Sequence, residues 1–148
     1  MTFASNTLIV TGSTTGLVSL WDVHDPTKPS ALSTISRHTG TVAGLAVQQR
    51  GELLASAADD GTIRLTTIRD PARPVEITAL QGGGPYDSAA LAFSPDGGTL
   101  AAASVNTFVL WSVDVSAILG RLCTDSNTIT EADWDRYLPG FEYDPPCA

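Results

Sequence analysis

GLVSLWDVHDP, at residues 16–26, is the stretch that decides the fold, because copies of it recur along the chain. Between Gly16 and Pro26 the apolar and polar residues alternate, which is typical of a β-strand bounded by turns. Pro26 lacks the N–H group that a sheet ladder needs, so we expect the strand to end before it. One such strand occurs in many β proteins, whereas a regular recurrence indicates a repeat architecture.

The copies recur with a spacing of 45 residues. GTIRLTTIRDP at 61–71 begins 45 residues after the first copy, and TFVLWSVDV at 107–115 places Trp111 ninety residues after Trp21. A short apolar run and a turn precede each copy, which predicts a β-hairpin. The Asp-Gly pair at 60–61 is the strongest turn signal, because it tolerates positive φ angles. Further extended segments flank the hairpins, so we expect four short strands in each repeat.

Four strands in about 45 residues resemble a blade of the WD-repeat β-propeller family. The resemblance covers residues 3–115, and its clearest motifs are SRHTGTVAGLAVQQRGELLASAADDGTIRLTTI at 36–68 and LAFSPDGGTLAAASVNTFVLWSV at 91–113. We therefore predict an all-β fold, an incomplete WD-repeat β-propeller of about two and a half to three four-stranded blades, with a short, partly helical C-terminal extension.

The chain divides into a partial propeller at 1–115 and a capping extension at 116–148. Within the propeller we predict a blade remnant at 1–36, a blade at 37–80 and a blade at 88–115 that lacks its outermost strand. Closed propellers contain about four to eight blades, so this number cannot close a ring. Blade faces and strand edges left open need cover. We expect self-association or a partner chain to provide it, unless the chain is a truncated remnant.

The resemblance also implies a hydrogen-bonded set of His, Ser or Thr, Asp and Trp in each blade. The second repeat offers His38, Ser56 and Asp60, but Thr66 stands where Trp is expected. His38 could equally be a surface-loop histidine.

The first and third repeats keep the tryptophan, as Trp21 and Trp111, and lack the His and the turn Asp. Since no repeat has the whole set, we expect the fold to rest mainly on apolar packing between blades.

The tail from residue 122 onward departs from the repeat. Thr130 begins a helix-like pattern in which Trp134 shares a face with the residues three and four positions later. The tail resembles the extension of actinobacterial WD-repeat proteins, which implies a bacterial source and a capping role that includes Trp134. Cys123 and Cys147 bracket it, and either a disulfide or two free thiols, as in a reducing cytosol, remains open.

Composition limits the partners. The net charge of −8 and the scattered arginines argue against binding to nucleic acid, whose phosphates require Lys and Arg. No apolar run approaches the roughly 18 residues of a membrane helix, and the amino terminus lacks the pattern of a signal peptide. We expect a cytoplasmic protein whose partners are other proteins.

No residues converge on a recognisable reaction. QGGGPYD at 81–87 lacks the Lys-Ser/Thr of a phosphate-binding loop, and DSNTITEAD at 125–133 lacks the central Gly and the last Glu of a calcium loop. We predict no catalytic, cofactor-binding or metal-binding residue and no cofactor. The loops at 48–51 and 81–86 are candidate binding surfaces.

The leading functional interpretation is a non-enzymatic scaffold or sensor module for protein–protein interaction. The alternative is a detached C-terminal fragment of a larger bacterial signalling protein, such as a kinase or a nucleotide-binding ATPase with a WD-repeat region. Fold alone does not choose between them.

Overall fold

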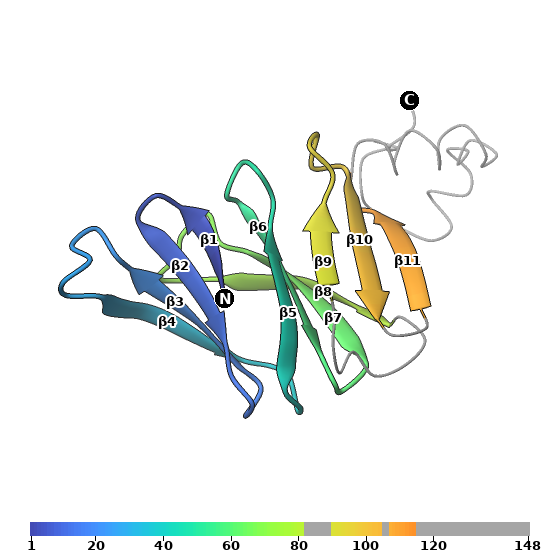
Figure 1. Cartoon of the computed structure of the whole chain (residues 1–148), viewed down its shortest axis with the longest axis horizontal. Coiled ribbons are helices and arrows are strands. Elements are labelled where there is room, and N and C mark those ends of the chain that lie inside the picture. The colour runs from blue at the N-terminus through green and yellow to red at the C-terminus, as the bar shows by residue number, and fades with distance from the viewer. Residues whose placement is uncertain (82–89, 105–106, 115–148) are drawn as a thin grey trace, which may run out of the picture. The chain divides into compact units, whose positions relative to one another are not determined.

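The structure is a computed structural model that describes residues 1–81, 90–104 and 107–114. The described residues form eleven β-strands in three antiparallel sheets, which we number blades 1, 2 and 3 in chain order (Figure 1). The chain divides into two compact units, Met1–Trp111 and Ser112–Ala148, and the sheets belong almost wholly to the first.

Blade 1 contains β1 (Thr2–Ser5), β2 (Leu8–Gly12), β3 (Leu17–Asp22) and β4 (Ser30–Ser36), hydrogen-bonded in that order. The sequence predicts only a blade remnant at 1–36, and the structure corrects this prediction with four paired strands. Residues 2–5 pair with β2, with Phe3 opposite Ile9. A strand of four residues is short, but the alternation of its side chains still matches the two faces of its neighbour, so the blade is four-stranded.

Blade 2 contains β5 (Val42–Val47), β6 (Leu53–Ala58), β7 (Thr62–Thr67) and β8 (Val75–Gln81), again in sequence order. Gly61 takes a φ of 81° in the turn between β6 and β7, as expected of an Asp-Gly hairpin. Gly16 takes a φ of 80° at the corresponding turn of blade 1. A Cβ atom on Gly16 would lie 2.3 Å from the carbonyl oxygen of His38, so glycine also permits the close approach of the two blades.

Blade 3 contains β9 (Ala90–Phe93), β10 (Thr99–Ser104) and β11 (Thr107–Ser112), in the order β11-β10-β9. Three strands are present among the described residues, so β11 is the edge where a fourth would pair. Gly97, with a φ of 76°, forms the turn between β9 and β10, and its N–H donates to the carbonyl of Ser94 at 2.8 Å.

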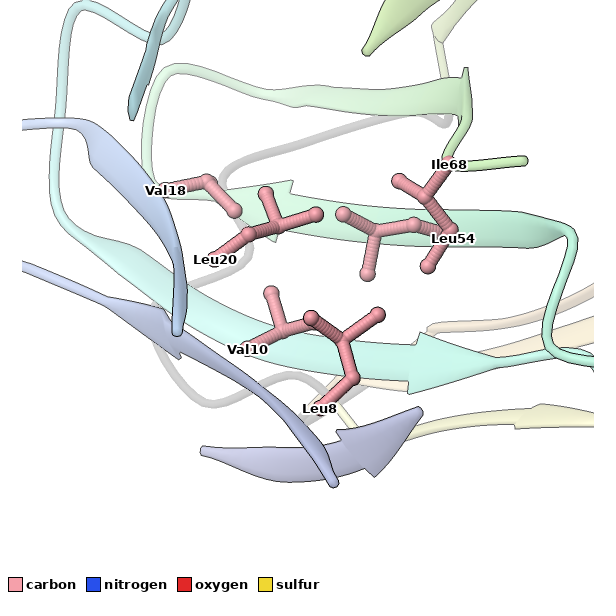
Figure 2. Packing of buried hydrophobic residues seen from close by; sticks show 6 residues of the cluster. All are labelled: Leu8, Val10, Val18, Leu20, Leu54 and Ile68. Carbon is pink, nitrogen blue, oxygen red and sulfur yellow. The ribbon is translucent and has the colours of Figure 1, made fainter. Parts of the chain in front are cut away.

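One apolar cluster joins blades 1 and 2. Alternation along β2 and β3 sends every second side chain toward blade 2, where those side chains meet residues of β6 and of the segment after β7. Figure 2 shows the six members of this cluster: Leu8, Val10, Val18, Leu20, Leu54 and Ile68. All six are buried, so apolar packing between successive sheets holds this part of the fold together.

Several predictions fall outside the described residues. These are the tail helix with Trp134, the state of Cys123 and Cys147, and nearly all of the loop at 81–86. Within the part of the chain that the structure does describe, no helix is long and apolar enough to cross a membrane.

Candidate functional site

Three residues of the predicted hydrogen-bonded set meet in blade 2. His38 lies in the link before β5, Ser56 lies on β6, and Asp60 lies in the turn between β6 and β7. Nε2 of His38 is 2.8 Å from Oγ of Ser56, and Nδ1 is 3.1 Å from Oδ2 of Asp60. A carboxylate only accepts, so Nδ1 donates to Asp60. His38 is 7% exposed, which excludes the surface-loop interpretation.

Asp60 accepts more hydrogen bonds than the sequence suggested. Its Oδ1 accepts from the backbone N–H of Thr62 at 2.9 Å and from the Thr62 hydroxyl at 2.7 Å, and its Oδ2 accepts from the N–H of Thr39 at 2.9 Å. We call His38, Ser56, Asp60 and Thr62 the His38 network. Thr62 was missed, although a Thr two residues after an Asp is a familiar turn pattern.

These contacts determine the ionisation of Asp60. Burial alone raises the pKa of its carboxyl, but the hydrogen bonds from Thr62, Thr39 and His38 outweigh burial and lower the pKa from 3.8 to about 2. The carboxylate therefore stays charged well into the acid range.

We expect Asp60 to make the protein acid-sensitive. Because the pKa is lower in the folded state, its contribution is full above pH 3.8 and is lost as the pH falls through about 2. At about 1.4 kcal/mol per pKa unit, the contribution is about 2 kcal/mol. Between about pH 5 and about pH 2, the free energy of unfolding of the wild type should fall about 2 kcal/mol more than that of Asp60→Asn.

Urea unfolding across that range measures the difference. Asp59→Asn, which removes the neighbouring carboxylate of the same turn, is the matched control for the loss of one charge. Equal pH dependence for wild type and Asp60→Asn would contradict the lowered pKa.

A Ser, a His and an Asp in hydrogen-bonded order also occur in nucleophilic hydrolases, but the geometry here does not suit that chemistry. A nucleophile must reach its substrate, and Ser56 is 3% exposed inside the sheet. The Asp60 carboxylate already accepts hydrogen bonds from Thr62 and Thr39, as the side chain of an Asp in a turn does. The arrangement therefore suits a structural link between the loop at His38 and the hairpin of β6 and β7.

Blade 1 contains a related contact. Nε1 of Trp21, on β3, donates to Oγ1 of Thr11, on β2, at 2.9 Å. Thr11 and Trp21 lie 45 residues before Ser56 and Thr66. The residues that form this contact in blade 1 therefore correspond to Ser56 and Thr66 of blade 2. The sequence pointed to Trp21 but not to Thr11, whose role depends on the pairing of the two strands.

The face of blade 1 that points away from the apolar cluster is hollowed. Phe3, Ile9, Trp21 and Val23 line an open and largely apolar groove of about 620 Å³, together with Met1, Asn6, Thr11, His24, Pro26 and Pro29. Phe3 is 66% exposed. We call this surface the outer groove. It arises because the alternation that buries Leu8 and Val10 places Ile9 on the opposite side of β2.

Blade 3 also presents apolar side chains. Phe108 and Leu110, two residues apart on β11, are 68% and 58% exposed. They share one face of the strand, whereas Trp111 lies on the other. Large apolar side chains gathered on an edge strand are typical of an interaction surface.

Comparison with known proteins identifies the repeat. Residues 29–66 match the family described as "WD domain, G-beta repeat". The chain is also similar to the "Periodic tryptophan protein 2 homolog" of Mus musculus, with 37% identity over 95 residues, or 61% of this chain. The chain spans 10% of the length of that relative.

The comparison and the three sheets together confirm the predicted fold class, an all-β, incomplete WD-repeat propeller. The matched span runs from the link before β4 to Thr66 and includes His38, Ser56 and Asp60. Blades 1 and 2 divide the expected hydrogen-bonded set: blade 1 has the tryptophan contact and blade 2 has the histidine contacts. The likeness of the tail to actinobacterial proteins stays a prediction.

Proposed function

We propose that the chain is a non-enzymatic module for protein–protein interaction, a scaffold or sensor of WD-repeat type. The observation that carries the proposal is the outer groove, an apolar surface with Phe3 exposed at its rim and Trp21 held in place by Thr11. An apolar concave surface on a rigid sheet is the kind of site that accepts an apolar segment of another protein.

The match to a WD repeat supports this role, because repeats of this architecture present broad surfaces built from successive units. A partner that fits the groove presents apolar side chains, with aliphatic or aromatic residues as anchors.

We further propose a cytoplasmic location. The described residues contain no group of three or more His, Cys, Asp and Glu side chains arranged to hold a metal ion.

The proposal is tested by affinity capture followed by reconstitution. Proteins retained by the immobilised wild-type chain are identified and purified, and their affinity is measured by calorimetry. We expect Phe3→Glu to weaken the interaction at least about tenfold, because it places a charge against an apolar partner. Val75→Glu is the matched control, since Val75 is 60% exposed on β8 of blade 2. Binding unchanged by Phe3→Glu would overturn the assignment to the outer groove.

A second candidate places the same interaction role in a longer bacterial polypeptide, such as a signalling kinase or nucleotide-binding ATPase. The match to a mouse relative of which the chain spans only 10% supports the greater length of the polypeptide, though not its bacterial source or its signalling activity. An antibody against blade 2 tests it: a band far above 15.4 kDa in the source cells is expected, and a band at that mass overturns it.

A further inference from the structure

The contact between blades 1 and 2 has two distinct sides. Blade 1 inserts side chains from β2 and β3, among them Val18 and Leu20, and blade 2 receives them with Leu54 and Ile68 (Figure 2). We call these the inserting face and the receiving face. Each WD-repeat blade has both, on opposite sides of its sheet, because side chains alternate along the strands.

The outer groove is the receiving face of blade 1. Ile9 and Val23, which line it, lie 45 residues before Leu54 and Ile68. By the repeat, they hold the positions through which blade 2 receives blade 1. No described residue fills this groove.

The exposed pair on β11 is the inserting face of blade 3. Phe108 and Leu110 lie ninety residues after Val18 and Leu20. Val18 and Leu20 are fully buried against blade 2, whereas Phe108 and Leu110 are largely exposed. Among the described residues, both halves of one interface are therefore exposed, the receiving face on blade 1 and the inserting face on blade 3.

We propose that a second copy of this chain covers these faces. Phe108 and Leu110 of the first copy insert into the outer groove of the second copy. The same residues of the second copy insert into the outer groove of the first, and this second contact closes the ring. This rests on the proposed interaction role and names its partner. The contact is heterologous, and such contacts give closed rings when the rotation per copy fits. Two copies supply six sheets, twice the three that the described residues form, and six lies within the range of about four to eight blades in closed propellers.

Light scattering on a sizing column, over a wide range of concentration, tests the assembly. We expect a discrete species of twice 15.4 kDa that dissociates on dilution. A monomer at every concentration, or an open series of increasing masses, overturns the closed pair. A monomer leaves the proposed function standing if a different captured partner binds the outer groove.

Two variants test the head-to-tail geometry. Phe3→Glu alters the groove and Leu110→Glu alters the inserting face, and both residues are exposed, so each variant should fold. We expect each alone to be a monomer. An equimolar mixture should form a dimer again, because the intact inserting face of Phe3→Glu meets the intact groove of Leu110→Glu. Val75→Glu should assemble as the wild type does.

A dimer that survives Leu110→Glu would show that two grooves pack against each other, and it would overturn the proposal. A mixture that stays monomeric at the highest concentration would overturn it as well. Far-ultraviolet circular dichroism of each variant verifies that the sheets are retained.

Discussion

Asp60→Ala is expected to lower the free energy of unfolding by about 3–5 kcal/mol, because it leaves the buried His38 and the half-buried Thr62 without their acceptor. The carboxylate accepts from the Thr62 hydroxyl, from the backbone N–H groups of Thr39 and Thr62, and from His38. The Asp60 side chain is only 8% exposed, so water replaces these contacts poorly. Urea unfolding at neutral pH, followed by circular dichroism, measures the change.

Asp59→Ala is the matched control for the turn, and its effect should stay within about 0.5 kcal/mol. His38→Ala and the double variant complete a cycle. Because His38 and Asp60 share a hydrogen bond, their effects should be less than additive by about 1–2 kcal/mol. A cost for Asp60→Ala no larger than that for Asp59→Ala would contradict a stabilising role for the network.

Much of the fold could be predicted because its signals are local. The Asp-Gly pair before β7 required a positive φ, and Gly61 adopts one. Alternation within residues 16–26 placed Val18 and Leu20 on one face of the strand, and the structure buries both against blade 2. The period of 45 residues gave the number of blades, since it depends only on positions in the chain.

Features that depend on pairing between strands could not be predicted. Residues 1–36 were predicted as a blade remnant, because the four residues of β1 are too few to show a periodicity, yet pairing with β2 makes them a strand. The partner of Trp21 could not be named, because Thr11 lies ten residues away on a neighbouring strand. Phe108 and Leu110 are exposed because no described sheet packs against their face of β11. Their apolar character alone does not predict this exposure.

Leu54→Ala is expected to cost about 3–5 kcal/mol, because it removes buried methyl groups at the contact between two blades. Leu54 is fully buried and belongs to the cluster that receives Val10 and Leu20 of blade 1. Each blade of a repeat protein is stabilised by its neighbours, so a cavity here weakens both sheets at once. The urea transition should therefore shift to lower concentration and also broaden, because blades 1 and 2 no longer unfold together.

Leu32→Ala provides the comparison, since Leu32 is 38% exposed on β4 and lies outside the cluster. Its cost should be below about 1 kcal/mol, because little apolar surface is removed from the interior. A similar cost for the two leucines would mean that the sheets are stable without their shared face. The receiving face would then contribute little to the contact between blades. The outer groove, formed by the corresponding residues of blade 1, would then also be expected to bind a partner only weakly.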